Sequence, residues 1–328
     1  SIAIWRKIDE SGTHPGHVTV LDALGRLHLD LGQYARAYEY QSASLSMARR
    51  VFTEEQYPDG HEILSRSLQN MATLYWFMGE TEKAAACYHE AVERNEKLFP
   101  EDKYPNRHPI LQQSYAAWGC LLMLERRFDE AEDYLMRAHE SAVTLYDASR
   151  YPRGHQLLNQ ALSDLGTLEL HRGRHSQAQG YFERVLENLG KLHDGQLPQA
   201  NHAVADTLAE LGRARLAQGM IDEAMCDFRE SLRHRKALLP EELCPQGHPR
   251  LFRALIDLGK AHFQAEEYDQ AVEHFSAAAQ MEFELVKSFC ESCSEAELLN
   301  YVGRKLKAVD YLISTSALEK SQVGAVYQ

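Results

Sequence analysis

The chain has 328 residues, of which 44% are hydrophobic and 25% charged, the balance of a globular protein rather than a disordered one. Its 35 Lys and Arg against 48 Asp and Glu give a formal charge of −13, which argues against nucleic acid or an anionic membrane as the main partner. No run of about 18 apolar residues occurs, so no transmembrane helix is expected.

Along the chain, three features recur every 46 to 47 residues. The first is a small residue, the second is a turn residue seven positions later, and the third is an alanine five positions beyond the turn. The small residues are Gly25, Ala72, Gly119, Gly166, Gly212 and Gly259. The turn positions are Gly32, Gly79, Arg126, Gly173, Gly219 and Glu266. The alanines are Ala37, Ala84, Ala131, Ala178, Ala224 and Ala271.

Apolar residues between these features have helical spacing, for example Leu158, Leu162 and Leu165 around Gly166. Each repeat of the sequence is therefore predicted to be a helix, a tight turn, a second helix and a loop. The small residue and the alanine would let the two helices approach closely, since larger side chains would force them apart.

A loop of the form Pro-x-x-His, usually preceded by Tyr, is expected to separate the units, because Pro cannot continue a helix. Histidines mark it at His17, His61, His108, His155, His202 and His248. Neighbouring units should lie about 10 Å apart, too far for these histidines to share a metal ion at His–metal distances of about 2 Å. We expect instead that each loop histidine hydrogen-bonds backbone at a helix start.

The recurring Gly, the leucine or aromatic four residues before it, and the Ala twelve after it resemble the tetratricopeptide (TPR) repeat. The stretch from Leu255 to Ala271 is similar to the kinesin-light-chain subclass of these repeats. This resemblance implies an all-α, right-handed superhelical solenoid over residues 1–285. Its parts would be a partial repeat at 1–13 and repeats starting near 17, 61, 108, 155, 202 and 248. The period exceeds the 34 residues of the common repeat, so the second helix or its loop must be longer.

The tail, residues 286–328, is not a repeat. Ser294 and Glu297 form a capping box that opens a predicted helix, which would cover the last repeat. The tail near Ser294 also resembles the join between repeats and a caspase-like CHAT domain in bacterial TPR–CHAT proteins. That resemblance implies an alternative function, the regulatory half of a protease whose catalytic domain is absent from this chain.

TPR proteins bind segments of partner proteins in a concave groove lined by the first helix of each repeat, and the resemblance implies the same here. Groove side chains such as Gln can hold a peptide backbone, and Arg can bind a carboxylate bidentately. The predicted groove residues are Arg26, Arg66, Gln69, Trp76, Gln113, Gln160, Thr167, Arg213, Arg253 and Lys260.

No nucleophile, phosphate-binding, dinucleotide or metalloprotease motif occurs, so we expect neither an enzyme nor a cofactor or metal. The close pair Cys290 and Cys293 lacks the second pair that a zinc site needs. Six scattered cysteines favour a reducing, cytoplasmic location. RNA binding would require a basic inner wall, and the net charge makes it the least favoured alternative. The sequence predicts a scaffold for a protein or peptide partner and leaves its oligomeric state open.

Overall fold

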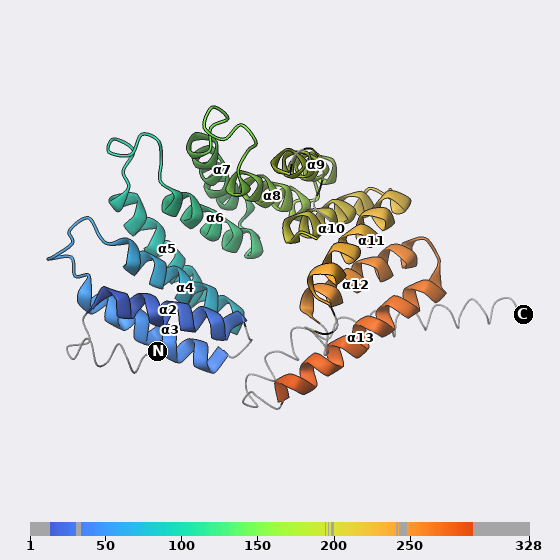
Figure 1. The fold of residues 1–328 in the computed structure, drawn as a ribbon, viewed down its shortest axis with the longest axis horizontal. Helices are drawn as coiled ribbons and strands as arrows, with labels where there is room; N and C mark the ends of the chain where they lie inside the picture. The colour runs from blue at the N-terminus through green and yellow to red at the C-terminus, as the bar shows by residue number, and fades with distance from the viewer. Residues whose placement is uncertain are drawn as a thin grey trace, which may run out of the picture. The chain divides into compact units, whose positions relative to one another are not determined.

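A computed structural model describes residues 14–30, 34–193, 195, 197, 200–240, 242 and 248–290. Within these residues the fold is all-α, with twelve helices and no strand (Figure 1). The predicted partial repeat at 1–13, the turn residue Gly32 and residues 291–328 of the predicted cap lie outside them. The predicted right-handed superhelix and array boundaries stay predictions.

The chain divides into two compact units, Ser1–Asp147 (unit 1) and Ala148–Gln328 (unit 2). Each unit contains three consecutive helix pairs. The pairs of unit 1 are α2 (Pro15–Asp30) with α3 (Tyr34–Val51), α4 (Glu62–Met78) with α5 (Thr81–Leu98), and α6 (Pro109–Leu124) with α7 (Phe128–Leu145). The pairs of unit 2 are α8 (Gln156–His171) with α9 (His175–Leu192), α10 (His202–Ala217) with α11 (Ile221–Leu238), and α12 (Pro249–Gln264) with α13 (Tyr268–Cys290).

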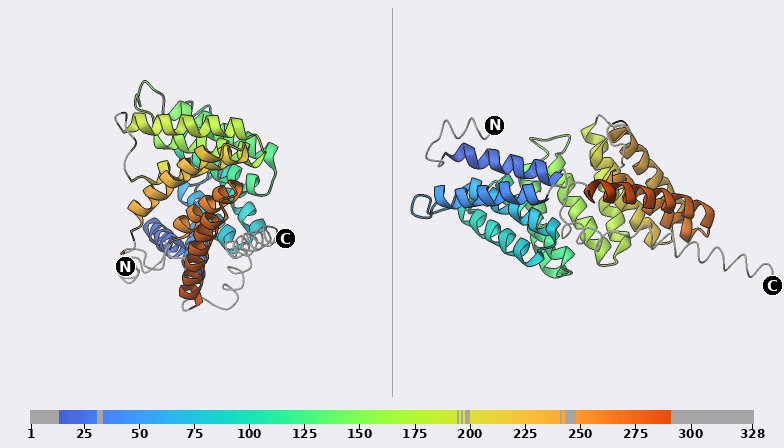
Figure 2. Two further views of the ribbon diagram at one scale, coloured as in Figure 1. Left: turned by 90° about the vertical axis from the view of Figure 1, so that its right-hand side faces the viewer. Right: turned by 90° about the horizontal axis from the view of Figure 1, so that it is seen from below.

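Within each unit every helix packs against the next one in the sequence (Figure 2). First helices of neighbouring pairs also meet, α2 with α4 in unit 1, and α10 with both α8 and α12 in unit 2. This is the paired packing that the repeat predicts, and the first helices of a unit therefore share one face.

The small residue and the alanine bring the two helices of a pair together, as predicted. All six landmark alanines are fully buried. A Cβ added at Gly166 would lie 2.8 Å from the Phe182 ring, and one added at Gly259 would lie 2.5 Å from the Phe275 ring. Since real Cβ contacts are not that short, these glycines leave the space that a side chain from the second helix fills.

The turn residue takes a left-handed backbone conformation in each pair where the structure describes it. Gly79, Gly173 and Gly219 have φ between 77° and 81°. Arg126 (φ 64°) and Glu266 (φ 60°) adopt the same conformation with a side chain attached, which is less favourable.

The loop histidines cap the helices that follow them. Nδ1 of His61, His108, His155 and His248 accepts the backbone N–H two residues later, at 3.1–3.3 Å. An accepting Nδ1 requires a neutral imidazole with its proton on Nε2. Burial lowers the pKa of all four histidines, which favours that neutral form.

In two repeats the predicted capping residue was wrong. In the first, Nδ1 of His14 rather than His17 accepts the N–H of Gly16, at 3.0 Å. In the fifth, His202 is the first helical residue and Asn201 caps α10. The capping positions 14, 61, 108, 155, 201 and 248 then follow the spacing of the small residues, which the set built on His17 and His202 did not.

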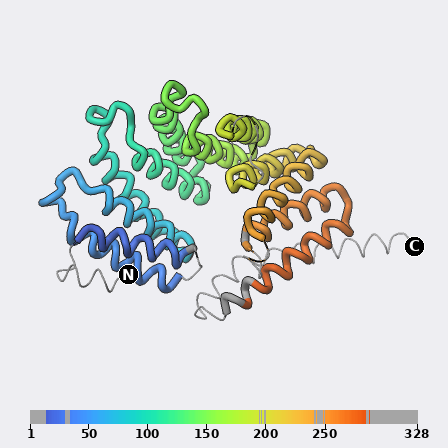
Figure 3. Tube along the Cα trace, viewed as in Figure 1, coloured from blue at the N-terminus to red at the C-terminus, as the bar shows by residue number. Residues whose placement is uncertain are grey.

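Rings at the end of each second helix hold the capping histidines of unit 1. Phe99 stacks on His108 with centroids 3.7 Å apart, and Tyr104 meets the Phe99 ring edge-on at 5.3 Å. Phe52 stacks in the same way on His61, at 3.9 Å. The Tyr of the loop is thus a packing residue. The loops account for the long period together with second helices of at least 18 residues (Figure 3).

Candidate functional site

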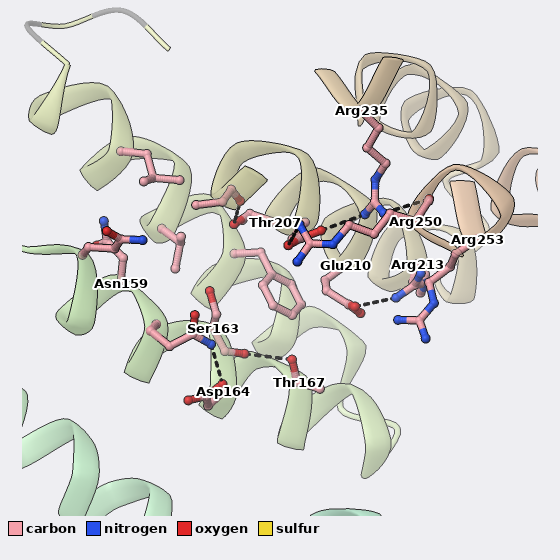
Figure 4. A pocket seen from close by; sticks show the side chains of 17 residues that line it. Asn159, Ser163, Asp164, Thr167, Thr207, Glu210, Arg213, Arg235, Arg250 and Arg253 are labelled. Atoms are coloured by element: carbon pink, nitrogen blue, oxygen red, sulfur yellow. Dashed lines mark hydrogen bonds and ion pairs between the residues drawn. The ribbon is translucent and has the colours of Figure 1, made fainter. Parts of the chain in front are cut away.

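The shared face of the first helices in unit 2 encloses a hollow of about 420 Å³. Polar side chains of α8 lie on one side of it, and four arginines from α10, α11 and α12 lie on the other (Figure 4). Its floor is apolar, formed by Phe182, Val185 and Leu189 of α9. Such a mixture of an apolar floor and convergent polar groups is typical of a binding site.

The α8 side offers amide and hydroxyl groups together with the carboxylate of Asp164. Gln160 donates to Asp164 at 2.9 Å, and the Thr167 hydroxyl donates to the carbonyl of Ser163 at 2.9 Å. Asn159 is 4% exposed, and its Nδ2 has no hydrogen-bond partner among the described residues. This wall therefore carries amide groups that could bind a peptide backbone.

On the opposite wall, Arg213 is bound from two directions. Its Nη2 and Nε bind the two carboxylate oxygens of Asp257 at 2.6 and 3.2 Å, and its Nη1 binds Glu210. Burial disfavours the charge on Arg213, but the two carboxylates outweigh burial and raise the pKa of the guanidinium. Arg213 stays charged and held in place at any pH at which its partners are ionised.

Arg235 enters the hollow from α11 although it is only 4% exposed. It donates to Asp206 at 3.0 Å, to the Ser231 hydroxyl at 3.2 Å and to the carbonyl of Arg250 at 2.9 Å. Burial lowers the pKa of Arg235, and Asp206 opposes that effect. Arg250 also lies 3.6 Å from Asp206 and 2.8 Å from Nδ1 of His202, so α10, α11 and α12 are joined at this point.

Arg253 differs from the other three arginines. It is exposed, lines the hollow, and makes no hydrogen bond or ion pair within the described part of the chain. Arg213 is paired with Asp257 and Glu210, and Arg235 and Arg250 both lie near Asp206, whereas Asp164 lies on the α8 side and accepts from Gln160. Arg253 is therefore the cation that is available to an anionic group of a ligand.

The structure brings four of the ten predicted groove residues together around this hollow. These four are Gln160, Thr167, Arg213 and Arg253. Lys260, also in α12, does not line it. Whether these residues bind a partner stays a prediction.

The other five predicted residues lie in unit 1. Arg66 donates to the Thr19 hydroxyl at 3.2 Å, and Gln69 donates to the Ser114 hydroxyl, so both have structural partners. Gln113 is exposed, and Trp76 is 37% exposed with its ring against Phe77. Arg26 lines a separate hollow in unit 1.

Sequence reasoning missed Asn159, Arg235 and Arg250. Arg235 lies on a second helix, whereas the predicted groove used first helices alone. Its position holds a buried residue in each of the other five repeats, and Arg235 is the one cation among them; the others are Ala48, Asn95, Ala142, Leu189 and Glu282. Because an arginine is rarely buried unless it is paired, an arginine at a buried position indicates a role other than apolar packing.

Comparison with known proteins supports the repeat assignment. The tetratricopeptide-repeat family model matches residues 18–50 and 65–98. The chain contains tetratricopeptide repeats. None of the curated proteins matches the sequence.

Solved structures with a similar fold include TPR proteins. BtubC (BKLC) from P. vanneervenii matches with a TM-score of 0.55 and 20% identity, over 77% of this chain and 92% of that chain. The APC/C hetero-tetramer Cut9-Hcn1 matches with a TM-score of 0.55 and 16% identity, over 92% of this chain and 43% of that chain. A putative kinesin light chain from Podosopora anserina, with nearly identical TPR-like repeats, matches with a TM-score of 0.49 and 18% identity, over 70% of this chain and 98% of that chain. At these identities the likeness concerns the fold.

Among the described residues, no three or more His, Cys, Asp or Glu side chains are placed to hold a metal ion. No described helix has both the length and the apolar composition needed to cross a membrane.

Proposed function

We propose that this protein is a non-catalytic interaction scaffold that binds an extended segment of a partner protein along the first-helix face of unit 2. The observation that carries the proposal is the hollow, where Nδ2 of Asn159 on α8 and the guanidinium of Arg253 on α12 have no partner among the described residues. Amides on α8 suit a peptide backbone, and Arg253 suits an acidic side chain.

The test uses two arginine variants of unit 2. Arg253→Gln removes the arginine that has no partner in the described residues, and Arg184→Gln removes an exposed arginine of α9 that does not line the hollow. A photo-crosslinking residue at Gln160 would capture the bound segment for identification by mass spectrometry. We expect the captured segment to bind R184Q as it binds the unchanged protein, and to bind R253Q at least tenfold more weakly. Equal binding to both variants would refute the proposal.

The alternative, the regulatory half of a TPR–CHAT protease, is carried by residues around Ser294, outside the described part of the chain. It remains a prediction from sequence. A cytoplasmic location likewise rests on the scattered cysteines.

A further inference from the structure

A second hollow, of about 370 Å³, lies in unit 1 on the first-helix face of its first two repeats. Like the hollow of unit 2 it is lined by polar side chains, but it has one arginine rather than four. Its lining residues are Arg26 and Leu29 of α2, Gln41 of α3, and Asn70, Thr73 and Phe77 of α4.

Gln41 occupies a position that a ring or an aliphatic side chain fills in other repeats. The residue 16 positions after the small residue is Phe182, Phe228 and Phe275 in repeats four to six, and Leu135 in repeat three. Each of them packs over its glycine, and Gln41 packs over Gly25 in the same way. The first repeat therefore keeps the space for an apolar side chain and fills it with an amide.

This amide is buried without a partner. Gln41 is 1% exposed, and neither its Nε2 nor its Oε1 has a hydrogen-bond partner in the described residues. Nδ2 of Asn70, beside the same hollow, also has none. By contrast, Tyr88 at the equivalent position of repeat two places its hydroxyl 2.8 Å from that of Thr73. Buried polar groups normally have partners, so three unpartnered atoms at one hollow indicate that a ligand supplies them.

We propose that this hollow is a binding site for an amide group, either a peptide bond or the side chain of an Asn or Gln residue. The amide oxygen would accept from Nε2 of Gln41 and Nδ2 of Asn70, and the amide N–H would donate to Oε1 of Gln41. Arg26, exposed and without a hydrogen bond or ion pair in the described residues, lies at the same hollow and suits a neighbouring carbonyl or carboxylate. A peptide as the source of this amide rests on the proposed function; the site itself does not.

Titration of the ¹⁵N-labelled full chain with acetamide tests the site, with acetone as the matched probe because it has an acceptor oxygen but no N–H donor. The side-chain NH₂ signals of Gln41 and Asn70 are assigned by their loss in Gln41→Leu and Asn70→Ala. We expect both signals to shift saturably with acetamide and much less with acetone. In Gln41→Leu the Asn70 signal should no longer respond. Signals that stay fixed under acetamide would overturn the proposal and show that ordered water alone fills the hollow.

Stability gives a second readout that separates ligand binding from a structural role. Gln41→Leu introduces the side chain that Leu135 supplies in repeat three, and removes an unpaired buried amide. We expect its Tm to rise by about 2–6 °C. A fall in Tm would show that the amide has partners inside the protein, and the proposal would be wrong.

The reverse substitution, Leu135→Gln, is the control. It places the same amide over Gly119 in repeat three, so it should lower Tm and create no response to acetamide. Failure of the acetamide titration would leave the proposed function standing, because the binding of the partner segment to unit 2 is tested separately with Arg253→Gln.

Discussion

Units 1 and 2 are built from the same repeat, but the buried polar residues between their helices differ. Ser44 and Ser231 hold the same position in the second helix of repeats one and five, and both donate to the same carbonyl of the preceding first helix. Ser44 reaches the carbonyl of Val18 at 3.2 Å, and Ser231 reaches that of Ala205 at 2.6 Å. The residues that contact these two serines differ between the two units.

In unit 1, short polar side chains fill the space around Ser44. Asp22, 3% exposed, accepts hydrogen bonds from the hydroxyls of Ser44 and Ser67 at 2.6–3.2 Å. In unit 2 the long side chain of Arg235 covers Ser231 and continues to Asp206 at the hollow. A buried polar cluster of short side chains therefore stabilises the core, whereas one built on arginine carries charge from the core to the surface.

The largest expected effect comes from Asp22→Ala, which removes the buried carboxylate that accepts from Ser44 and Ser67 and lies 3.7 Å from Nε of Arg66. We expect a loss of about 3 kcal/mol in the free energy of unfolding, measured by urea denaturation. Arg235→Leu should cost less than about 1.5 kcal/mol, because Leu189 fills the equivalent position in repeat four and the Asp206 carboxylate stays half exposed beside Arg250. If Arg235→Leu destabilises as much as Asp22→Ala, the two clusters have the same role and the contrast between the units is wrong.

Acidification should affect both units alike, because each contains two of the four histidine caps whose pKa burial lowers. The folded-state pKa of each of these histidines is below 6.5, so the unfolded chain binds more protons as pH falls. The stability that the caps contribute is complete above about pH 6.5 and is lost as pH falls through the lowered folded-state pKa. At about 1 kcal/mol per cap, each unit would lose about 2 kcal/mol.

Thermal melts between pH 7.5 and 5 measure this loss. Replacing His61, His108, His155 and His248 by Asn, the residue that caps α10 at Asn201, supplies an acceptor that does not titrate. We expect the quadruple variant to lose most of the acid sensitivity. A variant as acid-sensitive as the unchanged protein would mean that other groups cause it.

The smallest expected effect concerns the turn residues that have a side chain, one in each unit. Unit 1 has Arg126 and unit 2 has Glu266 in a left-handed turn conformation where other repeats have Gly. Arg126→Gly and Glu266→Gly should each stabilise the protein by up to about 1 kcal/mol, as measured by the urea midpoint. Unequal gains would show that the two turns are strained differently.

The period of the sequence predicted the helix pairs, their close approach at the alanines and the tight turns, because these depend on local geometry that each repeat specifies again. It misplaced two caps, since a neighbouring His or Asn can take the role by a shift of one to three residues. It also missed Arg235 and Gln41, because both lie on second helices, whereas the predicted groove used first helices alone. The two proposed sites thus depart from the repeat, and only the three-dimensional contacts show what surrounds each departure.

The most direct test of the account is the affinity of the crosslinked partner segment for three proteins: the unchanged chain, Arg253→Gln and Arg184→Gln. We predict an increase in Kd of at least tenfold for Arg253→Gln and no change for Arg184→Gln. A Kd that is unchanged in Arg253→Gln would contradict the central claim that the hollow of unit 2 binds the partner.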